Sequence, residues 1–292
     1  MKTISILIPT YNGTCTQLVS QLQQQAQALP IDYEILVADD GSTDSAVVCA
    51  NRAINQLPCC RYIERPTNQG RAAIRNFLAR EAQYDWLLFI DSDMSVVHDD
   101  FIYKYVSHPE ASVIYGGVSI GGDAEALRGN LRHRYEKASE PDHTLEKRQQ
   151  QPYHDFHTAN FCVSRQVMLS HPFDERIRCY GYEDVLFGKQ LRHDRIAITH
   201  IDNPMGFCSF EQNPDFMAKT EEGLRTLHAF RSELRGYSRL LTLVDGIHLP
   251  VVLAVIRLLF RLFGPLVRRQ LCGSRPSLRL FSLYKLGYLV TR

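Results

Sequence analysis

The sequence predicts an α/β fold, with a mostly parallel sheet flanked by helices and a basic helical tail at the C-terminal end. Short apolar runs alternate with amphipathic segments between residues 3 and 201, a pattern typical of repeated strand–helix–strand units. Acidic side chains directly follow several of these runs. Residues 238–292 differ in character, because they combine apolar stretches with many arginines.

The first half of the chain predicts its elements most clearly. A proline ends the first strand, and Ser42 or Thr43 is suited to cap the second helix. The run from Trp86 to Ile90 is apolar throughout, as in a central strand buried on both faces. In order, we expect strand 3–9, helix 16–29, strand 33–38, a helix ending near Leu57, strand 60–64, helix 71–82 and strand 86–90.

The pattern is looser after Asp93. Residues 121–156 are polar and highly charged, which indicates either a functional loop or a pair of surface helices. The other elements we expect are helix 101–108, strand 111–118 broken at Gly116-Gly117, strand 158–164, helix 185–191, strand 196–201 and helix 215–236.

Charge is distributed unevenly along the 292 residues, although the net charge is only +1. Residues 235–292 carry ten Lys and Arg against one acid, a net charge of +9, whereas residues 1–234 carry −8. The near-neutral total predicts no nucleic-acid partner. The eight cysteines form no Cys-x-x-Cys pair, which favours buried free thiols in a reducing cytoplasm. A strand pattern begins at once, so we expect no signal peptide.

The apolar stretch 247–267 resembles a membrane segment, but Arg257 and Arg261 interrupt it. Arginines are costly in a bilayer core, so we expect a helix lying in the membrane interface with its arginines reaching the lipid headgroups. A basic helical subdomain packed on the body or on a partner is the alternative. These features predict a catalytic domain at residues 1–236 and an amphipathic tail at 237–292. The location that they predict is cytoplasmic and peripheral, on the inner face of the cytoplasmic membrane.

Two carboxylates, Asp91 and Asp93, end the apolar strand 86–90. In open α/β sheets, ligands bind at the carboxyl ends of the strands, and paired carboxylates there suit a divalent cation. An ordinary solvated turn is the simpler interpretation. Further polar groups are expected at the same edge of the sheet: Thr10-Tyr11-Asn12, Asp39-Asp40 and Glu183-Asp184.

Five stretches in this order resemble the family 2 glycosyltransferases, inverting enzymes with the Rossmann-like GT-A fold of nucleotide-diphospho-sugar transferases. The resemblance covers roughly residues 3–210 and leaves the tail outside. The stretches are 8–12 (Ile-Pro-Thr-Tyr-Asn), 37–44 (Val-Ala-Asp-Asp-Gly-Ser-Thr-Asp), 68–76 (Asn-Gln-Gly-Arg-Ala-Ala-Ile-Arg-Asn), 89–93 (Phe-Ile-Asp-Ser-Asp) and 173–175 leading to 181–184.

The resemblance implies a nucleotide-sugar pocket and a metal site. Asp39 or Asp40 would accept hydrogen bonds from the base or ribose, since a carboxylate only accepts. Asp93, with Asp91, would hold Mn²⁺ or Mg²⁺ on the diphosphate. His200 is a candidate third ligand, although Phe207 stands where relatives often have a further histidine. The other residues that the resemblance places in the pocket are Pro9, Thr10, Tyr11, Gly70, Arg71 and Ser92.

The resemblance assigns the catalytic base to Asp184, with Glu183 orienting the acceptor or exchanging roles with it. Alternatively, the two acids could simply stabilise the N-terminus of the helix through its dipole. His157 and Asn160 are expected to face the acceptor. For Arg75 and Asn76, contact with the nucleotide and simple helix packing are equally good interpretations.

Together these features predict an inverting, metal-dependent hexosyl- or N-acetylhexosaminyl-transferase. A nucleotide-diphosphate sugar, with a UDP-sugar favoured, would be the donor, and a hydroxyl of a glycan or lipid-linked molecule the acceptor. One alternative is a non-catalytic nucleotide- or glycan-binding scaffold. The other is a sugar-phosphate nucleotidyltransferase, which is disfavoured because the loop after the first strand has no lysine or arginine.

Overall fold

The computed structural model describes residues 1–292, and its chain divides into two compact units. The first unit comprises Met1–Gly121, His143–Arg178 and Glu183–Ser209; the second comprises Gly122–Asp142, Cys179–Tyr182 and Phe210–Arg292. The boundary predicted at residue 236 lies inside the second unit. The reason is that helix α9 (Asn213–Ala229) packs against the C-terminal helices α12 (Pro250–Leu271) and α13 (Leu278–Val290).

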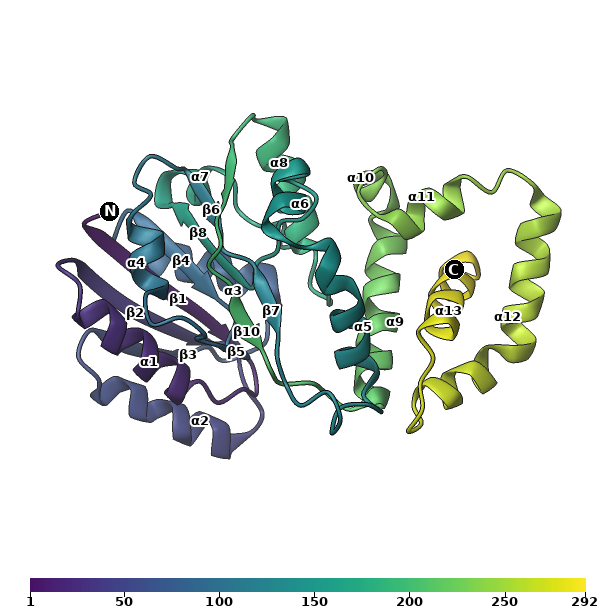
Figure 1. Cartoon of the computed structure of the whole chain (residues 1–292), viewed down its shortest axis with the longest axis horizontal. Helices are drawn as coiled ribbons and strands as arrows, with labels where there is room; N and C mark the ends of the chain where they lie inside the picture. Colours follow the sequence, from purple (N-terminus) through teal and green to yellow (C-terminus); the bar gives the residue numbers. More distant parts are fainter. The chain divides into compact units, whose positions relative to one another are not determined.

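A seven-stranded sheet forms the centre of the first unit, in the order β3-β2-β1-β4-β8-β6-β9 (Figure 1). Strands β3, β2, β1 and β4 run parallel, whereas β8 is antiparallel to both of its neighbours. The mostly parallel sheet is therefore confirmed. Its strands are β1 (Thr3–Thr10), β2 (Asp32–Asp39), β3 (Cys60–Glu64), β4 (Trp86–Ile90), β6 (Val113–Tyr115), β8 (Asn160–Ser164) and β9 (Ile198–His200).

A small second sheet has the order β5-β10-β7. It is made of β5 (Met94–Ser95), β10 (Met205–Phe207) and β7 (Val118–Ile120). The Gly116-Gly117 break thus divides one predicted strand into β6 and β7, which join different sheets. Because β5 follows Asp93 directly, the acidic turn after β4 lies between the two sheets.

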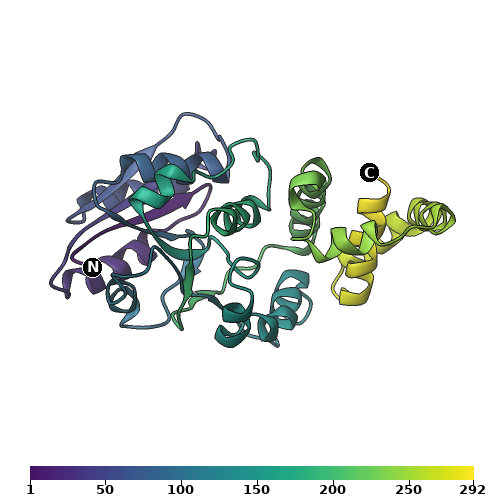
Figure 2. The same ribbon diagram turned by 90° about the horizontal axis from the view of Figure 1, so that it is seen from above.

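Helices cover both faces of the large sheet (Figures 1 and 2). Leu7, Leu87 and Phe89 share one buried cluster with residues of α3 and α8, and strand alternation turns Ile6 and Ile8 toward the other face. The helices of this unit are α1 (Thr16–Gln27), α2 (Ser45–Asn51), η1 (Arg52–Gln56), α3 (Arg71–Glu81), α4 (Phe101–Val106), α6 (Leu145–Gln150), α7 (Arg165–Ser170) and α8 (Glu183–His193).

Two details differ from the sequence-based predictions. Asp44, not Ser42 or Thr43, caps α2, because its Oδ1 accepts hydrogen bonds from the amides of Ala46 (2.9 Å) and Val47 (3.3 Å). All eight cysteines are free, as predicted, but only Cys15 and Cys162 are buried.

The second unit is helical. Helix α13 lies between α9 and α12 (Figure 1). Gly287 permits the close approach of α12, since a Cβ atom there would lie 2.3 Å from the Phe260 ring. Besides α9, α12 and α13, the unit contains α5 (Leu131–Ser139), η2 (Glu140–Asp142), α10 (Arg231–Leu234) and α11 (Arg239–Asp245). Residues 121–156 contain two short helices, α5 and α6, which belong to different units.

Candidate active site

The carboxyl ends of β1 and β2 lie side by side, with Thr10 paired to Asp39. Asp39 is buried, and its two oxygens accept hydrogen bonds from the Ser42 amide (2.6 Å) and the Tyr62 hydroxyl. Asn12, in the left-handed region (φ 51°), accepts from the amides of Thr43 and Asp44. The two loops after these strands therefore form one rigid pair.

Asp40 organises the start of α3. One of its oxygens pairs with the Arg65 guanidinium, and the other accepts from the amides of Gln69 (3.1 Å) and Gly70 (2.8 Å). Burial raises the pKa of Asp40, and these donors oppose that rise. Gly70 has φ 92°, and a Cβ atom there would lie 2.8 Å from the Arg178 carbonyl oxygen, so only glycine fits.

The remaining predicted pocket residues differ in exposure. Tyr11 is 47% exposed, whereas Thr10 is buried with its hydroxyl donating to the Gly13 carbonyl. Arg71 is exposed at the first position of α3. Ser92 lies beside the loop after β1, since a Cβ atom on Gly13 would lie 3.3 Å from its Oγ. Contact with a nucleotide stays a prediction for these four residues. The same holds for Pro9, Asp39 and Asp40.

A buried arginine connects the two acidic motifs. Arg75, on α3, has only 1% of its side chain exposed; it donates to Asp91 Oδ1 at 2.7 Å and to Glu183 Oε1 at 3.2 Å. One guanidinium thus brings the turn after β4 and the first turn of α8 together. The periodicity of α3 does not indicate that Arg75 is buried and forms ion pairs. The only sign of its importance in the sequence was its place in the family-like stretch 68–76.

The loop that leads to the second acidic motif is fixed by Asn76, the next residue of α3. The Asn76 side chain accepts from the Phe173 amide and donates to the Phe173 carbonyl, both at 2.9 Å. It also donates to Glu175 Oε1 at 2.9 Å. The hydrogen bonds of Asn76 therefore serve to hold this loop on α3.

Glu183 and Asp184 begin α8 in different environments. The Glu183 side chain is 5% exposed, and burial, followed by the charge of Asp184, raises its pKa. The Asp184 side chain is 21% exposed, and its Oδ2 lies 3.2 Å from His157 Nδ1. Burial would raise the pKa of Asp184, but the hydrogen bond and charge of His157, together with the Val185 amide and the charge of Arg75, hold the pKa below its usual range. Asp184 is thus the more accessible member of the pair and the one whose pKa is lowered.

Loss of His157 is expected to weaken Asp184 as a base at low pH. In His157→Ala, the pKa of Asp184 rises because its hydrogen bond and positive neighbour are gone, so the acid limb of the kcat/KM profile moves to higher pH. The stability from this pair is present above the unfolded-state pKa of the aspartate and is lost as pH falls through its folded-state pKa. His193→Ala, at an exposed position on the same helix, should leave the profile unchanged; an identical profile in His157→Ala would contradict the assignment.

Asp91 and Asp93 provide hard oxygen ligands at the carboxyl end of β4. Nowhere in the chain do three His, Cys, Asp or Glu side chains gather as a metal site. Mg²⁺ commonly takes one or two carboxylates and completes its shell with substrate phosphates and water, so this donor set fits a metal that arrives with a diphosphate. Asp91 Oδ1 accepts from Arg75, and metal ligation by Asp91 and Asp93 stays a prediction.

His200 and Asn160 are engaged elsewhere. His200 is buried, with Nδ1 3.3 Å from Arg148 and Nε2 3.0 Å from the Pro152 carbonyl oxygen. Both ring nitrogens therefore have protein partners, and burial lowers the pKa of His200 to about 4. Asn160 is fully buried and bonds Tyr105 and the carbonyls of Gly117 and Asn203, so it does not face an acceptor. We omit both from the proposed site.

Comparisons with known proteins identify the family of the chain. The model of the family described as glycosyl transferase family 2 matches residues 5–171. An uncharacterized glycosyltransferase of Haemophilus influenzae is 37% identical over 102 residues, which is 34% of this chain and 39% of that protein. A second protein of that organism with the same description matches over 29% of its length. The matches thus span well under half of these relatives.

Solved structures resemble the whole fold. Staphylococcus aureus TarS 1–349 in complex with UDP superimposes with a TM-score of 0.52 at 17% identity, covering 99% of this chain and 89% of that one. The mannosyltransferase PcManGT from Pyrobaculum calidifontis, in complex with GDP-Man and Mn²⁺, gives 0.54 at 13% identity, covering 96% and 85%. At such low identity the likeness establishes the fold alone.

Proposed function

The chain belongs to glycosyl transferase family 2, and from this premise we propose that it is an inverting glycosyltransferase with a nucleotide-diphosphate sugar as donor. The GT-A-like fold and the family are the basis. The observation that supports the proposal most strongly is the Arg75 bridge, because it ties Asp91, in the predicted diphosphate–metal turn, to Glu183, the neighbour of the predicted base.

In the proposed reaction, the Asp184 carboxylate takes the proton of an acceptor hydroxyl. The oxygen then forms a bond to the anomeric carbon while the bond to the leaving diphosphate breaks, which inverts the configuration. A divalent cation held by Asp91 and Asp93 would neutralise the charge that develops on the leaving diphosphate. Arg75 keeps Glu183 and Asp91 in place. The interaction with His157 lowers the pKa of Asp184.

We favour a UDP-sugar, because the superimposed TarS structure carries UDP, and a hydroxyl of a glycan or lipid-linked molecule as acceptor. The test is a panel of UDP-, GDP- and dTDP-sugars with Mn²⁺ or Mg²⁺, with released nucleotide as the readout. We expect release from one nucleotide class, abolition by EDTA and recovery on adding the metal. Release of pyrophosphate from a nucleoside triphosphate and a sugar phosphate would instead identify a nucleotidyltransferase. No turnover with any donor would favour the binding scaffold.

We also propose that the second unit binds the surface of an anionic membrane through α12. This helix is long and apolar enough, by length and composition alone, to cross a membrane, but Arg257 and Arg261 stand near its middle and favour an interfacial position. The Arg257 guanidinium donates to the Val290 carbonyl at 3.0 Å. Exposed apolar side chains follow the helix: Val251, Val252, Val255, Leu258, Leu259, Leu262, Phe263 and Leu266.

Charges placed on this face should abolish the association. In Leu258→Asp combined with Leu262→Asp, where the side chains are 57% and 60% exposed, we expect loss of cosedimentation with vesicles of phosphatidylcholine and phosphatidylglycerol, because aspartates are repelled and cannot enter the acyl region. Tyr103→Asp with Leu169→Asp, exposed in the first unit, is the matched control. Equal binding by both double variants would rule out α12 as the contact.

A further inference from the structure

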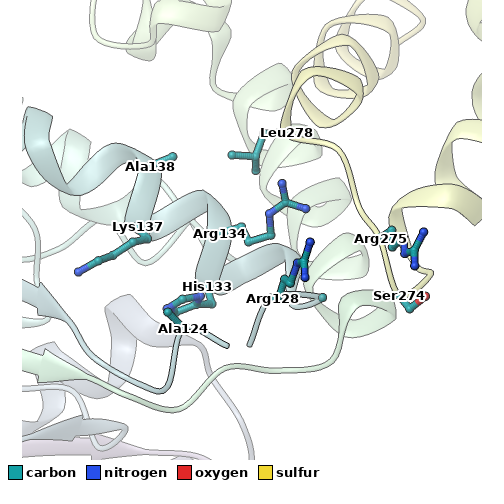
Figure 3. A pocket seen from close by; sticks show the side chains of 10 residues that line it. Ala124, Arg128, His133, Arg134, Lys137, Ala138, Ser274, Arg275 and Leu278 are labelled. Carbon is teal, nitrogen blue, oxygen red and sulfur yellow. The ribbon is translucent and has the colours of Figure 1, made fainter. Parts of the chain in front are cut away.

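The second unit contains a cavity of about 830 Å³ with a strongly basic lining. No aspartate or glutamate lines it (Figure 3). Its lining residues are Ala124, Arg128, Gly129, His133, Arg134, Lys137, Ala138, Ser274, Arg275 and Leu278.

The basic groups come from two segments of the chain, 122–142 and the loop between α12 and α13. Arg128 lies in the loop before α5, Arg134 on α5, and Arg275 in the loop between α12 and α13. Figure 3 shows that Lys137 points away from these three arginines, and it pairs with Glu140 at 2.7 Å. The charge of the cavity therefore comes from the three arginines.

Hydrogen bonds hold these segments together. The Asn213 side chain donates to the carbonyls of Gly129 and Gly273, both at 2.8 Å, and the Arg134 guanidinium donates to the Pro276 carbonyl. A Cβ atom on Gly129 would lie 2.7 Å from the Ser274 carbonyl oxygen. The backbone segments that carry the three arginines are thus fixed relative to one another, and Arg134 is itself held by the Pro276 carbonyl.

A polar group inside this lining lacks a partner. His133 is only 5% exposed, and its buried Nδ1 makes no hydrogen bond, although buried polar groups nearly always have one. Three arginines around one cavity without an acid also repel one another. An anion that accepts hydrogen bonds from the arginines would relieve this repulsion.

We propose that this cavity binds a phosphate group of a ligand, as a phosphate ester or a diphosphate. Guanidinium groups match the oxygen geometry of phosphate and bind it in a bidentate manner. The cavity volume of about 830 Å³ also has room for the rest of the molecule that carries the phosphate. Two sources carry this chemistry: a small soluble phosphate compound, and the headgroup of a lipid at a membrane surface contacted by the neighbouring α12.

The test uses the full chain and two probes, inorganic diphosphate by calorimetry in EDTA and vesicles of phosphatidylcholine with phosphatidic acid by cosedimentation. The cavity variant is Arg128→Glu with Arg275→Glu. The control is Arg269→Glu with Arg279→Glu, because these arginines are exposed in the same unit outside the cavity and change the net charge equally. Each titration is repeated with UDP, so that binding in the nucleotide pocket is recognised by competition.

We expect the cavity variant to lose about tenfold or more in affinity for at least one probe, with the control within about twofold of the wild type. Loss with diphosphate identifies a soluble phosphate ligand, and loss with vesicles alone identifies a lipid headgroup. The proposal is overturned if the cavity variant and the control lose the same affinity for the probes. It is also overturned if the wild type binds neither probe. A third contrary outcome is that UDP displaces all bound diphosphate while the cavity variant binds vesicles like the wild type. Since no lining residue belongs to the proposed catalytic set, these outcomes do not depend on transferase activity.

Discussion

Asp184→Asn is expected to lower turnover about 10²–10⁴-fold, the usual contribution of a positioned general base. Asparagine keeps the shape of the side chain and its hydrogen bond to the Val185 amide (2.8 Å in the wild type), but it cannot take the proton of the acceptor. Donor binding should change little, because the substitution does not touch the predicted nucleotide pocket. The measurements are nucleotide release, with water as acceptor where no sugar acceptor is known, and the Kd for UDP.

Asp194→Asn is the matched control for this prediction. Asp194 follows α8, is 43% exposed and pairs with His171 at 2.9 Å, so the same chemical change there should leave turnover nearly unaltered. Wild-type turnover in Asp184→Asn would remove the base assignment. If turnover falls only in Glu183→Gln, the role of base belongs instead to Glu183, which pairs with Arg75.

Arg75→Met is expected to destabilise the first unit by about 3–5 kcal/mol, because removing one partner of a buried ion pair leaves the other charges uncompensated. Asp91 and Glu183 would both lose their guanidinium. Trp86, the only tryptophan of the chain, begins β4 in this unit, so denaturant unfolding followed by its fluorescence reports the unit that holds the site. Activity should fall as well, since the two motifs are no longer held together.

The pH dependence separates this mechanism from a simple packing defect. Arg75 lowers the pKa of Glu183 against the rise caused by burial, so its loss raises that pKa further. A carboxyl with a raised pKa favours folding while protonated and loses that contribution as pH rises through its folded-state pKa. The deficit of Arg75→Met should therefore be smaller at about pH 5 than at about pH 8.

Two further variants complete the comparison. Arg75→Met combined with Glu183→Gln should recover part of the stability, because the buried charge is gone, but not the activity. Arg80→Met, on the same helix with its side chain 58% exposed and 4.0 Å from Glu175, should change stability by about 0.5 kcal/mol or less. Equal destabilisation by Arg75→Met and Arg80→Met would show that the bridge contributes nothing.

Most of the elements that were predicted correctly depend on patterns among residues close together in the sequence. Alternating apolar runs located β1 to β4 and the helices between them, because side-chain periodicity is a local property. The family motifs lie at the ends of those strands, and the parallel arrangement of β1, β2 and β4 brings those ends to one edge of the sheet. The sequence did not reveal the buried partners of His200 and Asn160, because those partners lie far away along the chain.

The sequence by itself determined the α/β class, the family and the acidic motifs, since each is written in short stretches of neighbouring residues. Only the tertiary structure decided that Arg75 bonds Asp91 and Glu183, which lie 16 and 108 positions away. It also decided that α9 and α5 pack with the C-terminal helices and that Arg275 lines one cavity with the distant Arg128 and Arg134. The reason is physical: burial and ion pairing depend on which segments meet in space, and periodicity along one segment does not specify its partner.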